Sequence, residues 1–533
     1  MAREQKSGSV LQWFPTLTVA AIAVLVAITF APSVWRLDPL IDEMYHLESW
    51  RNRYGTDDPL PVFHVRLAAT GKLTAGQKDW LADLYRTSPL FRRLLFVQSD
   101  PPSPLHSALG EIIQAASNSS VVALRIPSLI AAVGVVWLMY LLGRRLLDPG
   151  LACCLASLAC VGPLVQTYAG VGRSHMLAQF ALTGLLYSLI GSQEDPRRSP
   201  ARFLAWAVLA QVSHWSTWAV VGPVVGAEFI RRLTSGCSFM MLLKQSAWYL
   251  VTSVALIGVF VLQNVGTTAA GNMTGTFQGV WDYFCHASPF GFASQFGRKG
   301  FMTAAGLLFA ALALAGACVG LRETTTRLRA FVIPVIAGVC GSLIGMYFMT
   351  AGIRHMLIYQ APWIVLAGIG LRYACGTATC AMAVACGTVV LSALVALANP
   401  VDPYENLLHG DIRYSQPAAV LRRELRPGER WAAWPYYQGN AFFPFGPFPV
   451  PFLPNTEGEL LTIMTSADAP RFLFTTVDAE AANRASLPTP LKRTEYYGRS
   501  VLLEYPSRAP ESSGGNTASA DEQPAGSKPV DIP

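Results

Sequence analysis

The sequence predicts a polytopic α-helical membrane protein with about eleven transmembrane helices and a small C-terminal α/β domain. Of its 533 residues, 52% are hydrophobic and only 14% are charged, a balance typical of proteins that reside in a bilayer. Long apolar segments follow one another up to residue 398, and the composition then becomes that of a water-soluble domain. The net charge is +7, but the basic residues fall in short clusters between apolar segments, so no nucleic acid partner is predicted.

A helix needs roughly 20 mostly apolar residues to cross the hydrocarbon core of a bilayer. Somewhat fewer residues are enough where neighbouring helices shield the ends of the segment. On this basis the sequence predicts spans at 14–35, 124–143, 150–169, 174–191, 202–214, 216–230, 246–263, 301–321, 330–350, 355–371 and 376–398. No small-residue cleavage site precedes Asp38, so the first segment is predicted to remain as a span and not to be removed as a signal peptide.

The basic residues predict the orientation of these spans, because short connections rich in lysine and arginine stay in the cytoplasm. If every segment above is a span, one topology puts all the basic clusters on that side: Arg3 with Lys6, Arg144 with Arg145, Arg197 with Arg198, Arg231 and Arg232 with Lys244, Arg322 with Arg327 and Arg329, and Arg372. The N-terminus is then cytoplasmic and everything after residue 400 is extracytoplasmic. This pattern predicts an integral protein of the plasma membrane, which in a bacterium is the inner membrane.

The chain divides into three regions. Residues 1–399 are predicted to form the transmembrane domain, in which 36–123 is a large extracytoplasmic loop with helices lying in the membrane interface. Residues 400–507 are predicted to form a soluble extracytoplasmic α/β domain. Its expected elements are a helix at 418–425 and strands at 430–434, 471–477 and 500–505. The tail 508–533, rich in serine, glycine, alanine and proline, is predicted to be disordered.

The residues best suited to chemistry share the predicted extracytoplasmic face. Asp42 and Glu43 follow the first span directly, at the boundary between water and lipid, and Arg173 and Arg354 lie at the same boundary. A carboxylate can act there as general base toward an acceptor hydroxyl or amine, while an arginine can neutralise a leaving phosphate. The combination indicates transfer of a sugar from a polyprenyl-phosphate donor, which an enzyme must meet at the membrane interface.

Several short motifs support this interpretation by their order along the chain. They are Asp42-Glu43 with Tyr45; Asp100-Pro101-Pro102-Ser103-Pro104-Leu105; Leu124-Arg125-Ile126-Pro127-Ser128, leading to Leu142-Gly143-Arg144-Arg145-Leu146; Gln166-Thr167-Tyr168 through Arg173-Ser174-His175-Met176-Leu177; and Arg354-His355-Met356-Leu357 through Pro362. In these motifs, residues 14–372 resemble the GT-C class of membrane glycosyltransferases. The resemblance is to the branch that contains protein O-mannosyltransferases and the bacterial aminoarabinose transferases of lipid A.

The resemblance implies a GT-C-like fold and an inverting transfer to an extracytoplasmic acceptor, which can be a protein, a lipid or a glycan. It implies that Asp42 is the catalytic base and that Glu43 positions the acceptor or supports that base. The substrate-binding residues it implies are Tyr45, Asp100, Arg173, His175, Arg354 and His355. Asp100 stands where the family has a basic residue, and Ser174 and His175 displace the aromatic residue that usually follows the arginine. The donor or the acceptor is therefore expected to differ from those of the best-known members.

Other functions fit a polytopic chain with charges near its spans. A transporter or lipid flippase usually has charges near the bilayer midplane and internal repeats, neither of which the sequence shows. A non-catalytic scaffold whose soluble domain binds a partner would make Asp42 dispensable. No cofactor is required by the predicted chemistry and no metal site is predicted. His46 stands four residues after Asp42 and leaves a divalent metal open, although two candidate ligands are too few to define a site.

Overall fold

The structure is a computed structural model, and the two parts of the chain that it describes are a helical bundle and a C-terminal unit. The described residues are 105–106, 108–109, 112–113, 120–194, 200–264, 280–281, 283–284, 288–290, 299–323, 326–348, 356–398, 415–426, 429–434, 457–466, 468–496 and 500–506. The predicted span 14–35, most of the 36–123 loop and the tail lie outside the described residues.

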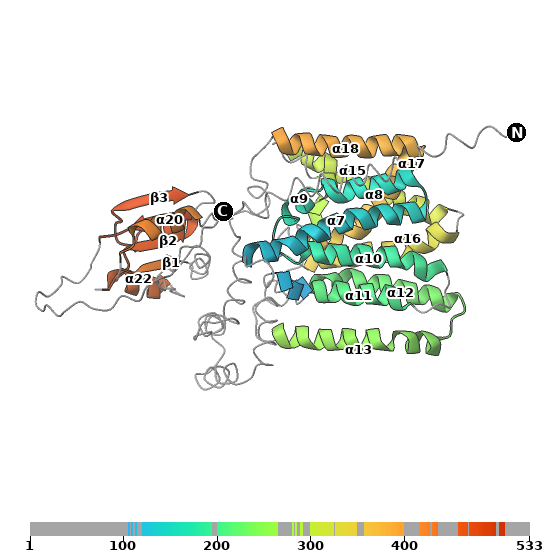
Figure 1. The fold of residues 1–533 in the computed structure, drawn as a ribbon, viewed down its shortest axis with the longest axis horizontal. Coiled ribbons are helices and arrows are strands. Elements are labelled where there is room, and N and C mark those ends of the chain that lie inside the picture. Colours follow the sequence, from blue (N-terminus) through green and yellow to red (C-terminus); the bar gives the residue numbers. More distant parts are fainter. Residues whose placement is uncertain are drawn as a thin grey trace, which may run out of the picture. The chain divides into compact units, whose positions relative to one another are not determined.

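The first part is a bundle of helices (Figure 1). They are α7 (Ser120–Leu146), α8 (Pro149–Val161), α9 (Pro163–Tyr168), α10 (His175–Glu194), α11 (Ala201–Ser213), the short 3-10 helix η1 (Trp215–Thr217), α12 (Trp218–Thr234), α13 (Phe239–Asn264), α15 (Lys299–Arg322), α16 (Thr326–Phe348), α17 (Met356–Ala374) and α18 (Ala378–Ala398). Every span predicted from 124–143 onward coincides with a helix, except that 150–169 is divided between α8 and α9. Among the described helices, four are long and apolar enough to cross a membrane: Arg125–Leu146, Phe239–Gly258, Thr303–Arg322 and Arg327–Tyr347. The total number of spans stays a prediction.

The division of the 150–169 segment has a local cause in its sequence. Gly162 has an extended conformation, with φ −66° and ψ 136°, and is followed by Pro163. A proline ring clashes with a helical residue before it and so favours an extended one, which ends α8 and lets α9 start on the proline. At the other end of α8, the side chain of Asp148 accepts a hydrogen bond from the Leu151 amide at 2.8 Å and caps the helix.

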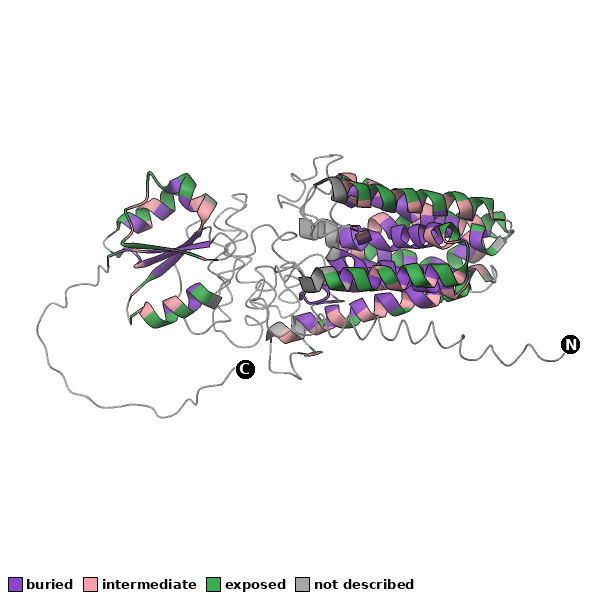
Figure 2. Cartoon of the chain, turned by 90° about the horizontal axis from the view of Figure 1, so that it is seen from above, coloured by how far each residue is buried: buried purple, intermediate pink, exposed green. Residues whose placement is uncertain are grey.

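The buried centre and the apolar surface of the bundle are formed by different helices. α17 is buried along the whole stretch from Met356 to Gly370. The outer helices α13, α15 and α18 instead expose large apolar side chains, such as Val251, Leu314 and Val390. Figure 2 shows the alternation of buried and exposed faces along the helices of the bundle. Exposed apolar faces on long helices are expected where the neighbouring molecules are lipid chains, so the bundle has the surface of an integral membrane protein.

Glycine allows α15 and α17 to approach closely. A Cβ atom added at Gly316 would collide with the Leu366 carbonyl oxygen, and one added at Gly370 would collide with the Leu312 carbonyl oxygen. We expect Gly316→Leu to destabilise the protein by about 1–3 kcal/mol, because the larger side chain forces the two backbones apart. The measurement is thermal unfolding in detergent. Gly258→Leu is the control, since a Cβ at Gly258 meets nothing within 4 Å; equal stabilities of the two variants would contradict the close approach.

The described residues of the C-terminal unit form a four-stranded sheet and three helices. Its elements are α20 (Ser415–Glu424), β1 (Trp431–Trp434), α22 (Glu457–Thr465), β2 (Phe472–Thr476), α23 (Val477–Asn483), β3 (Lys492–Tyr496) and β4 (Ser500–Glu504). The strand order is β1-β2-β4-β3; β1 runs parallel to β2, with Trp431 opposite Phe472, and β2 runs antiparallel to β4, with Phe474 opposite Leu502. The boundary at residue 400 and the extracytoplasmic location stay predictions.

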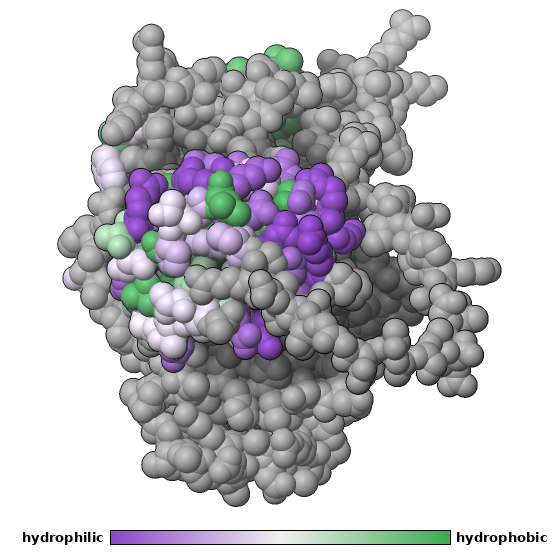
Figure 3. Space-filling view, turned by 90° about the vertical axis from the view of Figure 1, so that its left-hand side faces the viewer, coloured by the Kyte–Doolittle hydropathy of each residue, from purple (hydrophilic) through white to green (hydrophobic). Residues whose placement is uncertain are grey.

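Ion pairs hold the ends of these strands. Arg471 binds Glu429 and Glu504, each at 2.8 Å, and so joins the segments before β1, before β2 and at the end of β4. Arg493 on β3 binds Glu480 on α23 at 2.8 Å, and this hydrogen bond holds the pKa of the Glu480 carboxyl below its ordinary value. The face of this unit in Figure 3 is mainly hydrophilic, as expected of a surface in water.

Candidate functional site

Two of the predicted site residues lie in the described part of the chain, Arg173 and His175. The other predicted site residues, which are Asp42, Glu43, Tyr45, Asp100, Arg354 and His355, lie outside the described residues. Their roles stay predictions. The described part of the candidate site is therefore the end of the bundle at which Arg173 and His175 are located.

The helix directions identify that end. Arg372, in the last turn of α17, binds Asp148 just before α8, with 2.7 Å between Nη2 and Oδ2. α17 thus ends where α8 begins, so α8 and α9 run toward the end of the bundle at which α17 starts. The connection between α9 and α10, residues 169–174, lies there, and we call this the loop end. The opposite end carries the basic residues of the helix termini, and we call it the basic end.

The connection that carries Arg173 is fixed by hydrogen bonds. The Arg173 amide donates to the Val171 carbonyl oxygen at 2.7 Å, and the Arg173 carbonyl oxygen accepts from the Ser128 hydroxyl at 2.8 Å. Ser128 belongs to α7, so the peptide of Arg173 is tied to a neighbouring helix. The backbone of Arg173 is therefore fixed at the loop end. The Arg173 side chain is half-buried.

Four rings form a continuous row at the loop end. Tyr168 and His175 have ring centroids 5.1 Å apart, His175 and His214 are 5.0 Å apart, and His214 and Trp215 are 6.2 Å apart. We call these four residues the aromatic row. Tyr168, His175 and His214 are buried, and Trp215 is half-buried. The row joins the end of α9, the start of α10 and the end of α11, so it gathers residues from separate helices in one layer.

The orientation of His214 is set by its backbone neighbours. Its Nδ1 atom accepts a hydrogen bond from the Ser216 amide at 3.1 Å and thereby caps η1. In the neutral ring the proton then resides on Nε2, which is a hydrogen-bond donor. The Thr217 hydroxyl donates to the His214 carbonyl oxygen at 2.8 Å and fixes the turn. His214 is thus held as a rigid neighbour of His175.

One turn deeper on α10, Gln179 is fully buried. Neither its side-chain oxygen nor its side-chain nitrogen has a hydrogen-bond partner among the described residues. Gln211 on α11 provides a contrast. Its nitrogen donates to the Tyr249 hydroxyl at 3.4 Å, and its oxygen accepts from the Ser253 hydroxyl at 3.0 Å. The loop end therefore contains a polar side chain whose hydrogen-bonding capacity the described residues leave unused.

The described residues contain no group of three or more histidine, cysteine, aspartate and glutamate side chains placed to hold a metal ion. The pair of His175 and His214 alone provides too few ligands for a structural metal site. The alternative of a divalent metal near Asp42 concerns residues outside the described part of the chain and stays open.

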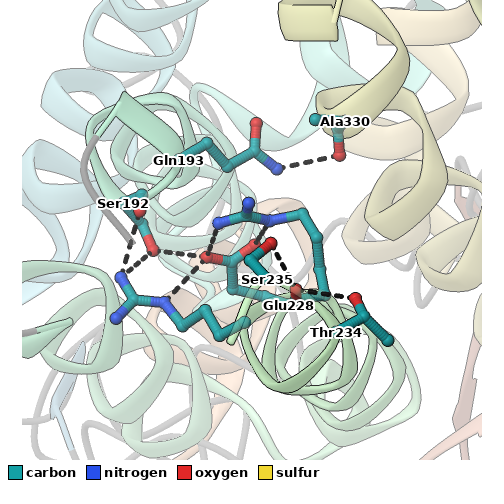
Figure 4. A network of polar contacts seen from close by, with 8 residues as sticks. Ser192, Gln193, Glu228, Thr234, Ser235 and Ala330 are labelled. Atoms are coloured by element: carbon teal, nitrogen blue, oxygen red, sulfur yellow. Dashed lines mark hydrogen bonds and ion pairs between the residues drawn. The ribbon is translucent and has the colours of Figure 1, made fainter. Parts of the chain in front are cut away.

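A buried ionic network lies at the basic end (Figure 4). Glu228 and Arg232 have fully buried side chains, and Arg232 Nε lies 3.0 Å from Glu228 Oε1. The same carboxylate accepts from Arg231 Nε at 2.7 Å and from the Ser192 hydroxyl at 2.7 Å. This network is not among the features predicted from the sequence, in which the two arginines indicate only the topology. The detectable signal was an acidic residue three and four positions before two arginines in an apolar segment.

The network connects three helices. Arg232 Nη2 donates to the Ser192 hydroxyl at 2.7 Å and to its carbonyl oxygen at 3.1 Å, which joins α12 to the end of α10. The side-chain amide of the adjacent Gln193 donates to the Ala330 carbonyl oxygen at 2.9 Å, which joins α10 to α16. The role of this network, which includes Glu228, Arg231 and Arg232, is therefore to hold the ends of α10 and α12 together.

The fold of this chain is similar to that of solved membrane proteins. No protein family model and no curated protein sequence matches the chain. Among solved structures, the apo crystal structure of ArnT from Cupriavidus metallidurans covers 93% of this chain and 98% of its own, with a TM-score of 0.52 and 13% sequence identity. The structure of ArnT from the same organism bound to undecaprenyl phosphate has a TM-score of 0.43 and 12% sequence identity. It covers 78% of this chain and 89% of its own. The archaeal oligosaccharyltransferase AglB from Archaeoglobus fulgidus, in complex with an inhibitory peptide and a dolichol-phosphate, has a TM-score of 0.46 and 13% sequence identity. It covers 89% of this chain and 71% of its own.

The likeness to apo ArnT extends over nearly the full length of both chains, which shows a shared fold. ArnT is a lipid A aminoarabinose transferase of the GT-C class. The resemblance inferred from the motifs is thus confirmed at the level of the fold: this chain is an integral membrane protein with the GT-C fold of ArnT.

Proposed function

We propose that the chain is a glycosyltransferase that moves a sugar from a polyprenyl-phosphate donor to an extracytoplasmic acceptor with inversion at the anomeric carbon. The observation that carries the proposal is that a chain with the ArnT fold holds an arginine, Arg173, on a fixed connection beside the aromatic row. ArnT itself is known bound to undecaprenyl phosphate. A fixed arginine at a helix end is suited to bind the phosphate of such a lipid.

The proposed reaction is a single displacement. Asp42 takes the proton from the acceptor hydroxyl or amine while the acceptor atom attacks the anomeric carbon. The bond between that carbon and the phosphate oxygen breaks, and the polyprenyl phosphate leaves with the bonding electrons. Arg173 and Arg354 stabilise the negative charge that grows on the phosphate, an effect that is large in a site of low dielectric constant. Glu43 positions the acceptor or supports Asp42.

The remaining predicted residues bind the substrates in this proposal: Tyr45, Asp100, His175 and His355. The C-terminal unit is proposed to bind the acceptor or to support the bundle. The proposed reaction requires no cofactor. A divalent metal is the alternative that a chelator tests directly.

The positions of the charged residues favour this function over a transporter or flippase. Every aspartate, glutamate, lysine and arginine in the described helices of the bundle lies within about two turns of a helix end. Transport sites with charged ligands are expected near the bilayer midplane. In the part of the chain that the structure describes, the most deeply buried charge pair is Glu228 with Arg232, and its hydrogen bonds are made by neighbouring residues at the basic end.

The test is transfer of radiolabelled sugar in membranes that contain the protein. A panel of undecaprenyl-phosphate sugars is supplied as donors, with and without EDTA, and labelled products are separated from the donor. Transfer from at least one donor that depends on the protein supports the proposal, and its loss in EDTA would assign a metal. Movement of the intact labelled donor across sealed vesicles, with no transfer, would identify a flippase.

A further inference from the structure

Two buried glutamines on the adjacent helices α10 and α11 differ in their side-chain hydrogen bonds. Gln211 has hydrogen-bond partners on α13 for both its oxygen and its nitrogen. Gln179, which is more deeply buried, has none for either atom among the described residues. A buried side-chain amide without hydrogen-bond partners lowers the stability of the protein, because it loses its hydration and gains no bond in return. A leucine of similar volume at the same position would avoid this cost. The contrast indicates that something other than the described residues hydrogen-bonds Gln179.

The direction of α10 indicates where that partner comes from. α10 begins at His175, at the loop end, and side chains of an α-helix lean toward its N-terminus. The long side chain of Gln179 therefore extends toward the turn that carries His175. Residues four apart share a helix face, so His175 lies on the same side of α10 as Gln179. Gln179 therefore lies on the helix face of α10 that begins at His175, a member of the aromatic row.

We propose that Gln179 and His175 form the sugar-binding end of the donor site, and that the Gln179 carboxamide hydrogen-bonds a hydroxyl group of the sugar that is transferred. The inference rests on the proposed function. A carboxamide both donates and accepts, which matches a hydroxyl group in the same way. The donor sugar is bonded directly to the phosphate, and Arg173, the proposed phosphate ligand, stands two residues before His175. A sugar attached to a phosphate at Arg173 therefore reaches the first turn of α10.

The experiment compares binding of two lipids to the purified full-length protein in detergent. One is undecaprenyl phosphate, and the other is undecaprenyl phosphate that carries glucose, mannose, arabinose or 4-amino-4-deoxyarabinose. Affinity is measured by microscale thermophoresis. In the wild type, the preferred sugar is expected to raise the affinity above that of the bare lipid. In Gln179→Leu, that gain is expected to fall about tenfold, the usual cost of one hydrogen bond in a buried site, while affinity for the bare lipid stays unchanged.

Gln211→Leu is the matched control, since it also removes a buried amide from the bundle. It is expected to lower the midpoint of thermal unfolding, because the Tyr249 and Ser253 hydroxyls lose a partner. Its discrimination between the bare and the sugar-bearing lipid should equal that of the wild type. Gln179→Leu should instead leave the midpoint of thermal unfolding equal to or above the wild-type value and reduce the discrimination between the bare and the sugar-bearing lipid.

Two outcomes would overturn the inference and one would overturn its basis. If Gln179→Leu retains the wild-type ratio of affinities, the carboxamide binds an ordered water and not the sugar. If no sugar raises the affinity of the wild type above that for undecaprenyl phosphate, the donor site has no sugar-binding end. If the wild type binds neither lipid, the proposed function itself is wrong, and the inference fails with it.

Discussion

Replacing Asp42 with asparagine is expected to lower sugar transfer by about two to four orders of magnitude, the usual contribution of a positioned general base. Asparagine has nearly the same shape as aspartate but takes no proton, so the acceptor remains a poor nucleophile. Affinity for undecaprenyl phosphate should stay near the wild-type value, because Asp42 is proposed to act on the acceptor and not on the phosphate. The measurement is the initial rate of radiolabelled transfer at equal protein levels.

Asp468→Asn is the control for this experiment. Asp468 lies in the C-terminal unit, its side chain is 78% exposed, and its Oδ2 atom lies 3.9 Å from Arg430 Nη1. Loss of this exposed carboxylate should leave transfer unchanged. A wild-type rate in Asp42→Asn would remove the catalytic role from the Asp42-Glu43 motif, and the base would then have to be sought elsewhere at the predicted extracytoplasmic face.

The helices of the bundle were predictable because apolar composition over a span's length is a strong signal. The break inside 150–169 was not predicted, although its cause, a glycine followed by proline, is visible in the sequence. Strand β3 was also missed. Its residues, Lys492–Tyr496, are mostly polar and form an exposed edge of the sheet, so no alternation of buried and exposed side chains marks them.

The site was only partly predictable, because its residues come together through helix packing. Arg173 and His175 were identified from one motif. The contact of His175 with His214 was not, since the two histidines belong to different helices and only the packing of α10 against α11 brings their rings within 5.0 Å. Gln179 gave no signal at all, because a single glutamine in an apolar segment usually finds a partner, as Gln211 does.

Replacing Glu228 with glutamine is expected to destabilise the protein by about 3–5 kcal/mol, because it leaves the buried Arg232 guanidinium without a counter-charge. Glutamine retains the shape of glutamate and an acceptor oxygen, so the loss reflects the missing charge and the repulsion between Arg231 and Arg232. The measurement is chemical denaturation in mild detergent. A stability within about 0.5 kcal/mol of the wild-type value would show that the network at the basic end does not hold α10 and α12 together.

Two comparisons separate this structural role from a catalytic one. Glu323→Gln removes a carboxylate from the same end of the bundle, where Glu323 accepts from the exposed Tyr373 hydroxyl at 2.6 Å. It should cost no more than about 1 kcal/mol, because its partner is neutral and water can replace the bond. Below its unfolding temperature, Glu228→Gln should transfer sugar at the wild-type rate, since Glu228 lies at the basic end and the aromatic row at the loop end. A fall in transfer by a still-folded Glu228→Gln protein would mean that the packing of α10 at the basic end controls the position of His175 and Gln179 at its other end.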